Sequence, residues 1–251
     1  MLRDKQFDEL SAEPERSRRI AAKTRHNLAT IALHLVVRFA VLCWFFAVAL
    51  LPVSSDGWPG WAITIGLIAA DLAAMIIVFV VADRAVTGFR PLRPRFCSIY
   101  QLPFWRHERY WKVPSVAFMR IFDGTPAKPV AWRLLGAQMG RRIFDDGCAI
   151  SERSLVSVGD EATLNMAGLL QSHSLEDGAF KSDRITIGRA CTIGTGALVH
   201  YAVTMGEGSL LEADSFAMKG TDIRPGARWL GNPATEEGPH GDLRRPRIGS
   251  P

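Results

Sequence analysis

The sequence has 251 residues, enough for one or two domains, and 48% of them are hydrophobic. Residues 28–82 are almost free of charge, whereas residues 1–27 and 83–134 are rich in Arg, Lys and aromatic side chains. This distribution excludes disordered and collagen-like chains, and a single soluble core does not account for it. The net charge of +5 flanks the apolar segments, which indicates a membrane surface as the partner and no nucleic acid.

Two apolar segments predict a transmembrane helical hairpin over residues 28–82. Residues 28–53 and 61–82 each exceed the roughly 20 residues that a helix needs to cross a bilayer. Lys and Arg precede the first segment and follow the second, while the loop at 54–60 has none. By the positive-inside rule, both ends of the hairpin are cytoplasmic. We therefore expect a multi-pass protein of the inner cell membrane that contacts lipids and has its remaining domains in the cytoplasm.

Each apolar segment contains one charged residue, Arg38 in the first and Asp71 in the second. An unpaired charge inside a bilayer costs several kcal/mol, so we expect these two side chains to form an ion pair. Intramembrane charges also leave open a transport or channel role.

Residues 83–137 combine aromatic rings with Arg, Lys and Pro, a composition typical of the lipid headgroup level. We expect this segment to form a collar beside the membrane. Within it, Pro114 is expected to open a short helix over residues 114–122, which Gly124 closes.

A six-residue repeat begins at Ile187. Apolar side chains occupy every sixth position, and small residues stand four positions after each of them up to position 221. The apolar positions are Ile187, Ile193, Val199, Met205, Leu211, Ala217 and Ile223, with Val158, Leu164 and Leu170 in an earlier frame. This period fits neither an α-helix nor strand alternation. It predicts an all-β, left-handed parallel β-helix over residues 138–234, with the aliphatic side chains inside and the small ones at corners.

The two repeat frames are not separated by a multiple of six, so a segment must leave the β-helix between them. The polar stretch 173–184 is the best candidate, and protruding loops on rigid scaffolds often carry function. The expected organisation is a basic cytoplasmic segment at 1–27, the hairpin at 28–82, the collar at 83–137, the β-helix at 138–234 and a flexible tail at 235–251.

The repeat, together with GNPA at 231–234, resembles the hexapeptide-repeat acyltransferases, which move acyl groups from a thioester to an amine or hydroxyl. Longer strings resemble the C-terminal region of non-ribosomal peptide synthetases of the epsilon-poly-L-lysine synthetase type. Among these strings are FWRHERYWKVP at 104–114, RRIFDDG at 141–147 and HSLEDGAFKSDR at 173–184.

The resemblance implies a donor held as a 4′-phosphopantetheine thioester on a carrier, or as a coenzyme A thioester. No adenylation domain and no carrier segment with a modifiable serine are evident in the sequence, so we expect a carrier and adenylation protein as partner. The resemblance also implies a homotrimer or an assembly with sibling β-helix domains.

Acyl transfer to an amine needs a base that titrates near neutral pH, and histidine is such a side chain. His173 opens the protruding loop, where the resemblance places the catalytic histidine, so we expect it to be the general base. Glu176 and Asp177 are expected to orient its imidazole or to hold a cationic acceptor; the alternative is a solvated acidic turn. His200 is expected to project outward at a corner and to contribute to substrate binding.

Further polar residues are candidates for substrate binding, with ordinary turn roles as the alternative. Asp145, Asp146 and Asn165 are the candidates for the acceptor, and Lys219, Gly231 and Asn232 for the donor. The four cysteines, Cys43, Cys97, Cys148 and Cys191, show no CxxC pair or metal-ligand spacing. We expect reduced cysteines that fill space, no covalent catalysis and no metal site.

The leading hypothesis is a membrane-bound acyl or aminoacyl transferase that forms an amide or peptide bond in non-ribosomal peptide synthesis. The alternative is a non-catalytic subunit that anchors a synthetase at the membrane and completes a trimeric or pseudo-trimeric assembly. A transport component acting through Arg38 and Asp71 is a third hypothesis.

Overall fold

The computed structural model describes residues 15–49, 58–112 and 117–237. The chain divides into two compact units. Unit 1 comprises Met1–Arg120 and Leu175–Lys181, and unit 2 comprises Ile121–Ser174 and Ser182–Pro251. The basic residues expected before residue 15, most of the expected loop at 54–60, Pro114 and the tail beyond residue 237 lie outside the described residues.

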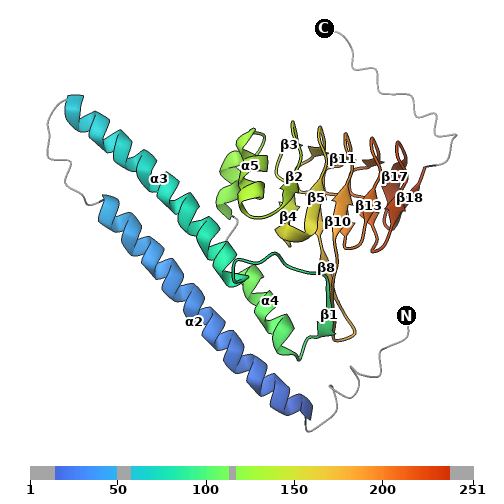
Figure 1. The fold of residues 1–251 in the computed structure, drawn as a ribbon, viewed down its shortest axis with the longest axis horizontal. Helices are drawn as coiled ribbons and strands as arrows, with labels where there is room; N and C mark the ends of the chain where they lie inside the picture. The colour runs from blue at the N-terminus through green and yellow to red at the C-terminus, as the bar shows by residue number, and fades with distance from the viewer. Residues whose placement is uncertain (1–14, 50–57, 113–116, 238–251) are drawn as a thin grey trace. The chain divides into compact units, whose positions relative to one another are not determined.

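Unit 1 contains two long helices, α2 (Glu15–Ala49) and α3 (Trp58–Val86), which run as a hairpin (Figure 1). Within them, Glu15–Trp44 and Ala62–Val86 are long and apolar enough to cross a membrane by length and composition. Large apolar side chains on both helices are exposed, including Leu35, Phe39 and Ile77. A helix that exposes apolar side chains on most of its surface fits a lipid environment better than water.

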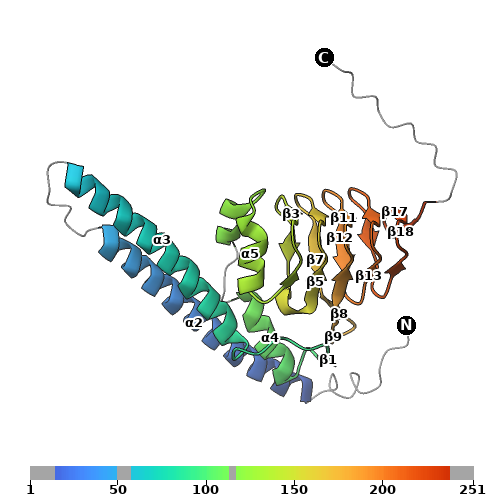
Figure 2. The same cartoon turned by 45° about the horizontal axis from the view of Figure 1, so that its top comes forward.

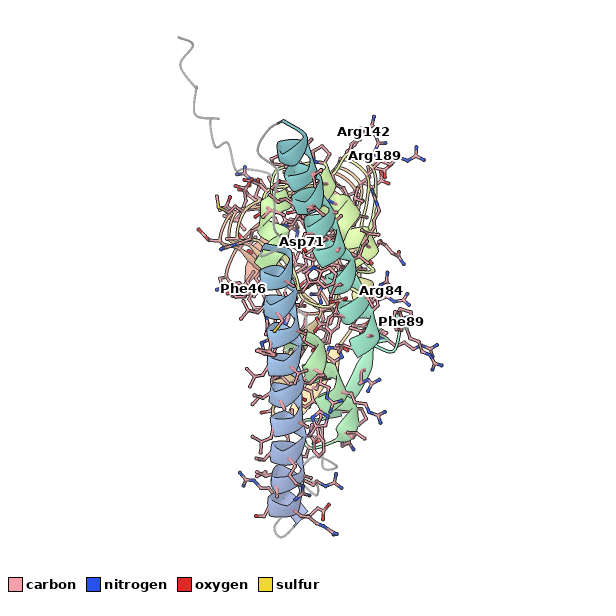
Figure 3. The ribbon with its side chains drawn as sticks, turned by 90° about the vertical axis from the view of Figure 1, so that its left-hand side faces the viewer. Phe46, Asp71, Arg84, Phe89, Arg142 and Arg189 are labelled. Carbon is pink, nitrogen blue, oxygen red and sulfur yellow. The ribbon has the colours of Figure 1, made fainter. Side chains whose placement is uncertain are left out.

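Asp71 has a different partner from the one expected. The indole Nε1 of Trp44 donates a hydrogen bond of 2.6 Å to Asp71 Oδ1, which joins the two helices (Figure 3 labels Asp71). Arg38 lies exposed on α2, and the described residues show no ion pair between it and Asp71. A neutral indole N–H satisfies the carboxylate without a second charge in the hairpin.

The collar contains helix α4 (Leu102–Lys112), which packs against α2 and α3. A 3-10 helix, η1 (Ala117–Phe122), follows in place of the short helix expected at 114–122. The strand β1 (Arg95–Ser98) forms a sheet with β8 (His173–Glu176) and β9 (Ala179–Ser182), in the order β1-β9-β8.

Unit 2 is a parallel β-helix whose coils stack in a row (Figure 2). Its strands are β2 (Gln138–Met139), β3 (Phe144–Asp145), β4 (Ala149–Ile150), β5 (Val156–Val158), β6 (Thr163–Leu164), β7 (Leu169–Gln171), β10 (Ile185–Ile187), β11 (Thr192–Ile193), β12 (Leu198–His200), β13 (Thr204–Met205), β14 (Leu210–Leu211), β15 (Phe216–Ala217), β16 (Asp222–Ile223), β17 (Arg228–Gly231) and β18 (Ala234–Glu236).

The strands form three faces. We call them the first sheet (β2, β5, β10, β13, β16), the second sheet (β3, β6, β11, β14, β17, with β18 antiparallel at its end) and the third sheet (β4, β7, β12, β15). Each coil contributes one strand to each sheet in turn. The helix α5 (Ala127–Leu134) packs on the first coil, at β2 and β3.

The residues expected inside the β-helix are buried, and the two repeat frames join in register. Leu164, Ile193, Val199 and Leu211 are all fully buried. Val158 pairs with Ile187 because residues 172–184 leave the coil between β7 and β10. The frame shift in the sequence therefore marks an insertion, as expected.

Glycines follow the interior residues of the first sheet because adjacent coils approach closely there. A Cβ on Gly206 would lie 2.5 Å from the nitrogen of Pro225, and one on Gly188 would lie 2.8 Å from the oxygen of Met205. Real Cβ atoms do not come this close to backbone atoms, so the corner accommodates only glycine at these two positions.

Candidate active site around His173

His173 lies where the chain leaves the β-helix. Strand β7 ends at Gln171, and β8 begins at His173. We call this edge, which follows the third sheet, the insertion corner. The His173 side chain is 15% exposed, so most of the imidazole is shielded while part of it reaches solvent.

A buried carboxylate contacts the imidazole. Oε1 of Glu152 lies 2.8 Å from Nδ1 of His173, and the Glu152 side chain is 0% exposed. A carboxylate accepts hydrogen bonds and does not donate them, so a carboxylate on this side of the ring favours a hydrogen on Nδ1. A carboxylate beside one ring nitrogen of a histidine is a feature of an oriented general base.

A short chain of hydrogen bonds holds Glu152. The hydroxyl of Ser151 donates to Glu152 Oε2. The backbone N–H of Ser172 in turn donates to the Ser151 hydroxyl at 3.1 Å. Two adjacent coils thus fix both the carboxylate and the start of the segment that carries His173.

His200 contacts the same segment through its backbone. Its Nε2 lies 2.9 Å from the carbonyl oxygen of His173, and Gln171 Nε2 donates to that oxygen at 3.2 Å. A carbonyl oxygen only accepts, so His200 Nε2 is the donor. The ring packs beside Tyr201 and Phe216, at centroid distances of 4.9 Å and 5.7 Å. His200 therefore holds the backbone of His173 in place.

Lys219 follows β15 by two residues, so it lies at the insertion corner one coil beyond His200. It is partly buried. Of the residues selected from the sequence, His173, His200 and Lys219 therefore share one corner of the β-helix.

The expected acceptor-binding residues lie at a different corner, the one that follows the second sheet. Asn165 Nδ2 donates to the carbonyl oxygen of Ile193 at 2.8 Å, a bond between adjacent coils. Asp146 is half-buried at the corresponding position of the first coil. Within one copy of the protein, these residues and His173 therefore lie at different corners of the β-helix.

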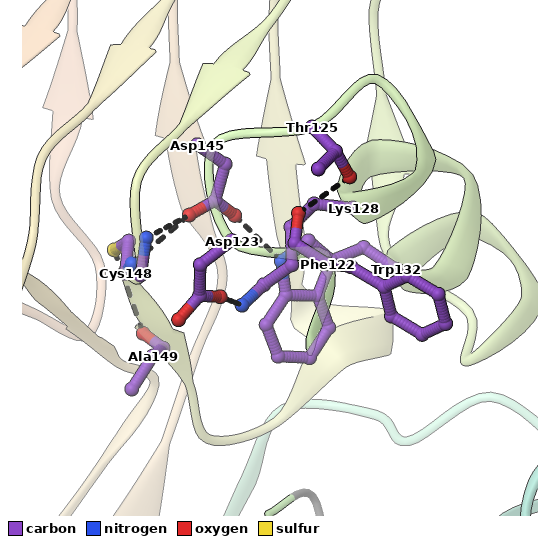
Figure 4. Close-up of polar contacts among 9 residues, drawn as sticks. Phe122, Asp123, Thr125, Lys128, Trp132, Asp145, Cys148 and Ala149 are labelled. Carbon is purple, nitrogen blue, oxygen red and sulfur yellow. Dashed lines mark hydrogen bonds and ion pairs between the residues drawn. The ribbon is translucent and has the colours of Figure 1, made fainter. Parts of the chain in front are cut away.

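Asp145 occupies an interior position, in register with Leu164, and is only 1% exposed. Its Oδ2 accepts a hydrogen bond of 2.7 Å from Trp132 Nε1 of α5, and its Oδ1 accepts from the N–H groups of Gly147 and Cys148 (Figure 4). Burial raises the pKa of the Asp145 carboxyl above its ordinary value, although these donors oppose the shift. The Asp145 carboxylate thus joins helix α5 to the first coil of the β-helix.

Glu176 and Asp177 lie at the far end of the inserted hairpin. Glu176 Oε2 is 3.9 Å from Lys181 Nζ, across the same hairpin. Asp177 and Gly178 form the turn, both with positive φ, 49° and 75°. Gly231 and Asn232 are exposed in the turn between β17 and β18, at the opposite end of the β-helix from α5.

Sequence reasoning missed Glu152, because its place beside His173 follows from the register of two coils. Ile150 pairs with Leu170, so two residues later Glu152 stands opposite Ser172 at the insertion corner. The irregular first coil conceals this register, because its spacing departs from six. Only the stacking of coils identifies Glu152 as a neighbour of His173.

The cysteines are free thiols in the described structure. Cys97, Cys148 and Cys191 are buried, and Cys43 is exposed on α2. Burial raises the pKa of the Cys148 thiol well above its ordinary value, which disfavours the nucleophilic thiolate. Within residues 15–49, 58–112 and 117–237, no group of three or more His, Cys, Asp or Glu side chains could hold a metal ion.

Solved structures similar to this chain are hexapeptide-repeat and related acetyltransferases. One is a maltose O-acetyltransferase from Clostridium difficile 630, with 17% identity, a TM-score of 0.41, and coverage of 57% of this chain and 91% of that chain. Another is a galactoside acetyltransferase in complex with coenzyme A, with 20% identity, a TM-score of 0.39, and coverage of 48% and 76%. No protein-family profile matches the chain.

A match to one curated protein indicates a narrower class than these structures do. Over 146 residues the chain is 28% identical to the delta-poly-L-ornithine synthetase of Acinetobacter baumannii (strain AB307-0294). The match covers 57% of this chain and 11% of the length of that synthetase. The resemblance to poly-amino-acid synthetases expected from the sequence is thus confirmed.

Proposed function

We propose that this protein is a membrane-bound acyl or aminoacyl transferase that acts in non-ribosomal synthesis of a poly-amino acid. The observation that carries the proposal is the contact of 2.8 Å between His173 and the buried Glu152 at the insertion corner. The similarity to an ornithine polymer synthetase supports amide formation as the reaction class.

In the proposed reaction, an amine attacks the carbonyl carbon of a thioester. His173 Nε2 accepts the proton of the attacking nitrogen as the C–N bond forms, and the C–S bond then breaks. The imidazolium returns the proton to the departing thiolate, so no net proton is consumed. Glu152 stabilises the imidazolium through Nδ1, and backbone N–H groups of the coils are proposed to stabilise the oxyanion.

The proposed donor is a 4′-phosphopantetheine thioester on a carrier and adenylation partner, or a coenzyme A thioester. Lys219, Gly231 and Asn232 are the proposed donor-binding residues, and His200, Asp146 and Asn165 the proposed acceptor-binding residues. Asp145 was expected among the latter, but its carboxylate is buried and bonded to Trp132, so we do not propose it as a binding residue. Glu176 and Asp177 supply the negative charge that a cationic acceptor requires.

We also propose that the β-helix is left-handed and that copies, or sibling β-helix domains, associate as trimers. The outward positions of the third sheet support a protein interface, because Leu198 pairs in register with Leu169 and Phe216 and all three are apolar. Within such an assembly, Asp146 and Asn165 of a neighbouring copy can approach the His173 corner.

The exposed apolar surfaces of α2 and α3 support an inner-membrane location in contact with lipids, with the β-helix in the cytoplasm. The domain limits given by the sequence, at 27, 82, 137 and 234, remain part of this proposal.

A transfer assay with the full chain in detergent tests the function. Synthetic pantetheine thioesters of ornithine, lysine and acetate are offered with amine acceptors, and amide products are measured by mass spectrometry. We expect His173→Ala to lower the rate by about 10²–10⁴-fold, the usual contribution of a general base. Thr186→Ala, at an exposed outward position of the first sheet, is the matched control.

Full activity of His173→Ala would show that His173 is not the base. Inactivity of the native chain with every donor, together with binding to a larger synthetase, would favour the anchoring subunit.

A further inference from the structure

The hairpin that begins with His173 ends in the core of unit 1. Its strands β8 and β9 join β1 in one sheet, and the N–H of Ile99 donates to the carbonyl oxygen of Gly178 at 2.9 Å. A two-stranded hairpin alone is marginally stable in water. The position of this hairpin therefore depends on what its tip contacts.

Phe180 of β9 is the principal apolar contact of the tip. Its side chain is 0% exposed and forms a core with Cys97 and Phe104. Its ring centroid lies 5.3 Å from that of Phe104, 4.6 Å from His107 and 5.9 Å from Trp111. Three of these four partners belong to α4.

The helix α4 is itself fixed to the long helices of unit 1. Arg109 Nε donates to the buried hydroxyl of Thr30 in α2 at 3.1 Å. The ring of Trp105 packs against His26 of α2, at a centroid distance of 5.6 Å. A continuous set of contacts thus runs from α2 through α4 to Phe180, and the chain continues from there to His173.

We propose that Phe180 is a positioning residue for the transferase reaction: its place in the core with Cys97 and Phe104 holds the β8–β9 hairpin, and the hairpin fixes the course of the strand that begins with His173. The inference rests on the proposed function. Displacing a catalytic group by about 1 Å can cost about 100-fold in rate, so a remote anchor has a measurable effect.

The experiment compares Phe180→Ala with Leu175→Ala in the full chain. Leu175 lies in the same hairpin but is 51% exposed, so it is the matched control. We expect Phe180→Ala to lower kcat about 10- to 100-fold with little change in KM for a small amine, and Leu175→Ala to change neither. Phe180→Leu, which keeps an apolar side chain, is expected to recover most of the rate.

A double-mutant cycle separates positioning from general destabilisation. If Phe180 acts through the His173–Glu152 contact, Phe180→Ala adds little to the loss caused by Glu152→Gln. Thermal unfolding of the β-helix, followed by circular dichroism, is expected to be the same for Phe180→Ala and Leu175→Ala.

Two results would overturn the inference, provided that His173→Ala remains inactive. One is full activity of Phe180→Ala, and the other is a double variant whose rate loss is the product of the losses of Phe180→Ala and Glu152→Gln. If Phe180→Ala fails to fold, Phe180→Val replaces it in the cycle, and losses that multiply with those of Glu152→Gln would again overturn the inference. An active His173→Ala would instead overturn the proposed function, and this inference with it.

Discussion

Glu152 is a fully buried carboxylate beside an imidazole that is largely shielded from water. A charge in such a place is retained only when it is paired and hydrogen-bonded, and here Ser151 and His173 supply both partners. We therefore expect this side chain to help set the position of the His173 ring.

Replacing Glu152 by Gln tests that role. We expect Glu152→Gln to lower kcat by about tenfold or more, within the range that a general base supplies, because the amide no longer stabilises the imidazolium. Glu152→Asp is expected to retain part of the rate. Steady-state kinetics check the result, with Glu161→Gln as control, since Glu161 is paired with Arg189 at an exposed corner. An unchanged kcat for Glu152→Gln would contradict the role.

Asp145 predicts a dependence of stability on pH. Burial raises its pKa in the folded state above the ordinary value of 3.8. The folded protein therefore holds the proton more tightly than the unfolded chain, and this stabilisation is lost as the pH rises through the folded-state pKa. Asp145→Asn, which cannot ionise, is expected to remove this dependence.

Thermal unfolding measured from pH 4 upward checks this prediction. The native chain should lose stability relative to Asp145→Asn as the pH rises. If the native chain instead gains stability relative to Asp145→Asn as the pH rises, the folded state favours the ionised carboxylate and the prediction is wrong.

At the scale of elements, the coils depend on close backbone contact at the glycine corner. We expect Gly206→Ala to destabilise unit 2 by about 1–3 kcal/mol, the usual cost of overpacking, because the added Cβ meets Pro225. Chemical denaturation followed by circular dichroism measures the change. Thr204→Ala, at an exposed position of β13, is the control and should change the denaturation midpoint little. An equal shift for both variants would show that close backbone contact at position 206 is not the cause.

The elements that sequence reasoning located are those whose signal is local and repeated. The period of six identifies the interior residues from Val158 to Ile223, and the change of frame identifies the insertion. Composition identifies α2 and α3. Each of these signals is complete within a few neighbouring residues.

The elements that it missed depend on contacts between distant segments. Asp145 lies inside the first coil because Trp132 of α5 supplies a donor there. Glu152 contacts His173 because two coils stack. Trp44, and not Arg38, bonds to Asp71 because of how α2 and α3 face each other. No spacing along the sequence encodes these three arrangements.

For the whole molecule, the apolar outer face of the third sheet leads to a prediction about assembly. We expect Leu198→Glu to shift the protein from trimers to monomers, since a charge in the middle of an apolar interface is costly to bury. Light scattering of the protein in detergent measures the mass. Thr186→Glu, on the polar first sheet, should leave the mass unchanged. A trimer that survives Leu198→Glu would place the interface elsewhere.

The exchange of residues 175–181 between the two units has a consequence for biosynthesis. The chain emerges from the ribosome from its N-terminus, so β1 and α4 appear long before Phe180, the residue that completes their core. Until then, the rings of Phe104 and Trp111 lack their partner, and the edge of β1 is unpaired. The core of Cys97, Phe104 and Phe180 is thus completed only after the second coil of the β-helix has been synthesised, which ties the maturation of unit 1 to that of the unit proposed to carry out catalysis.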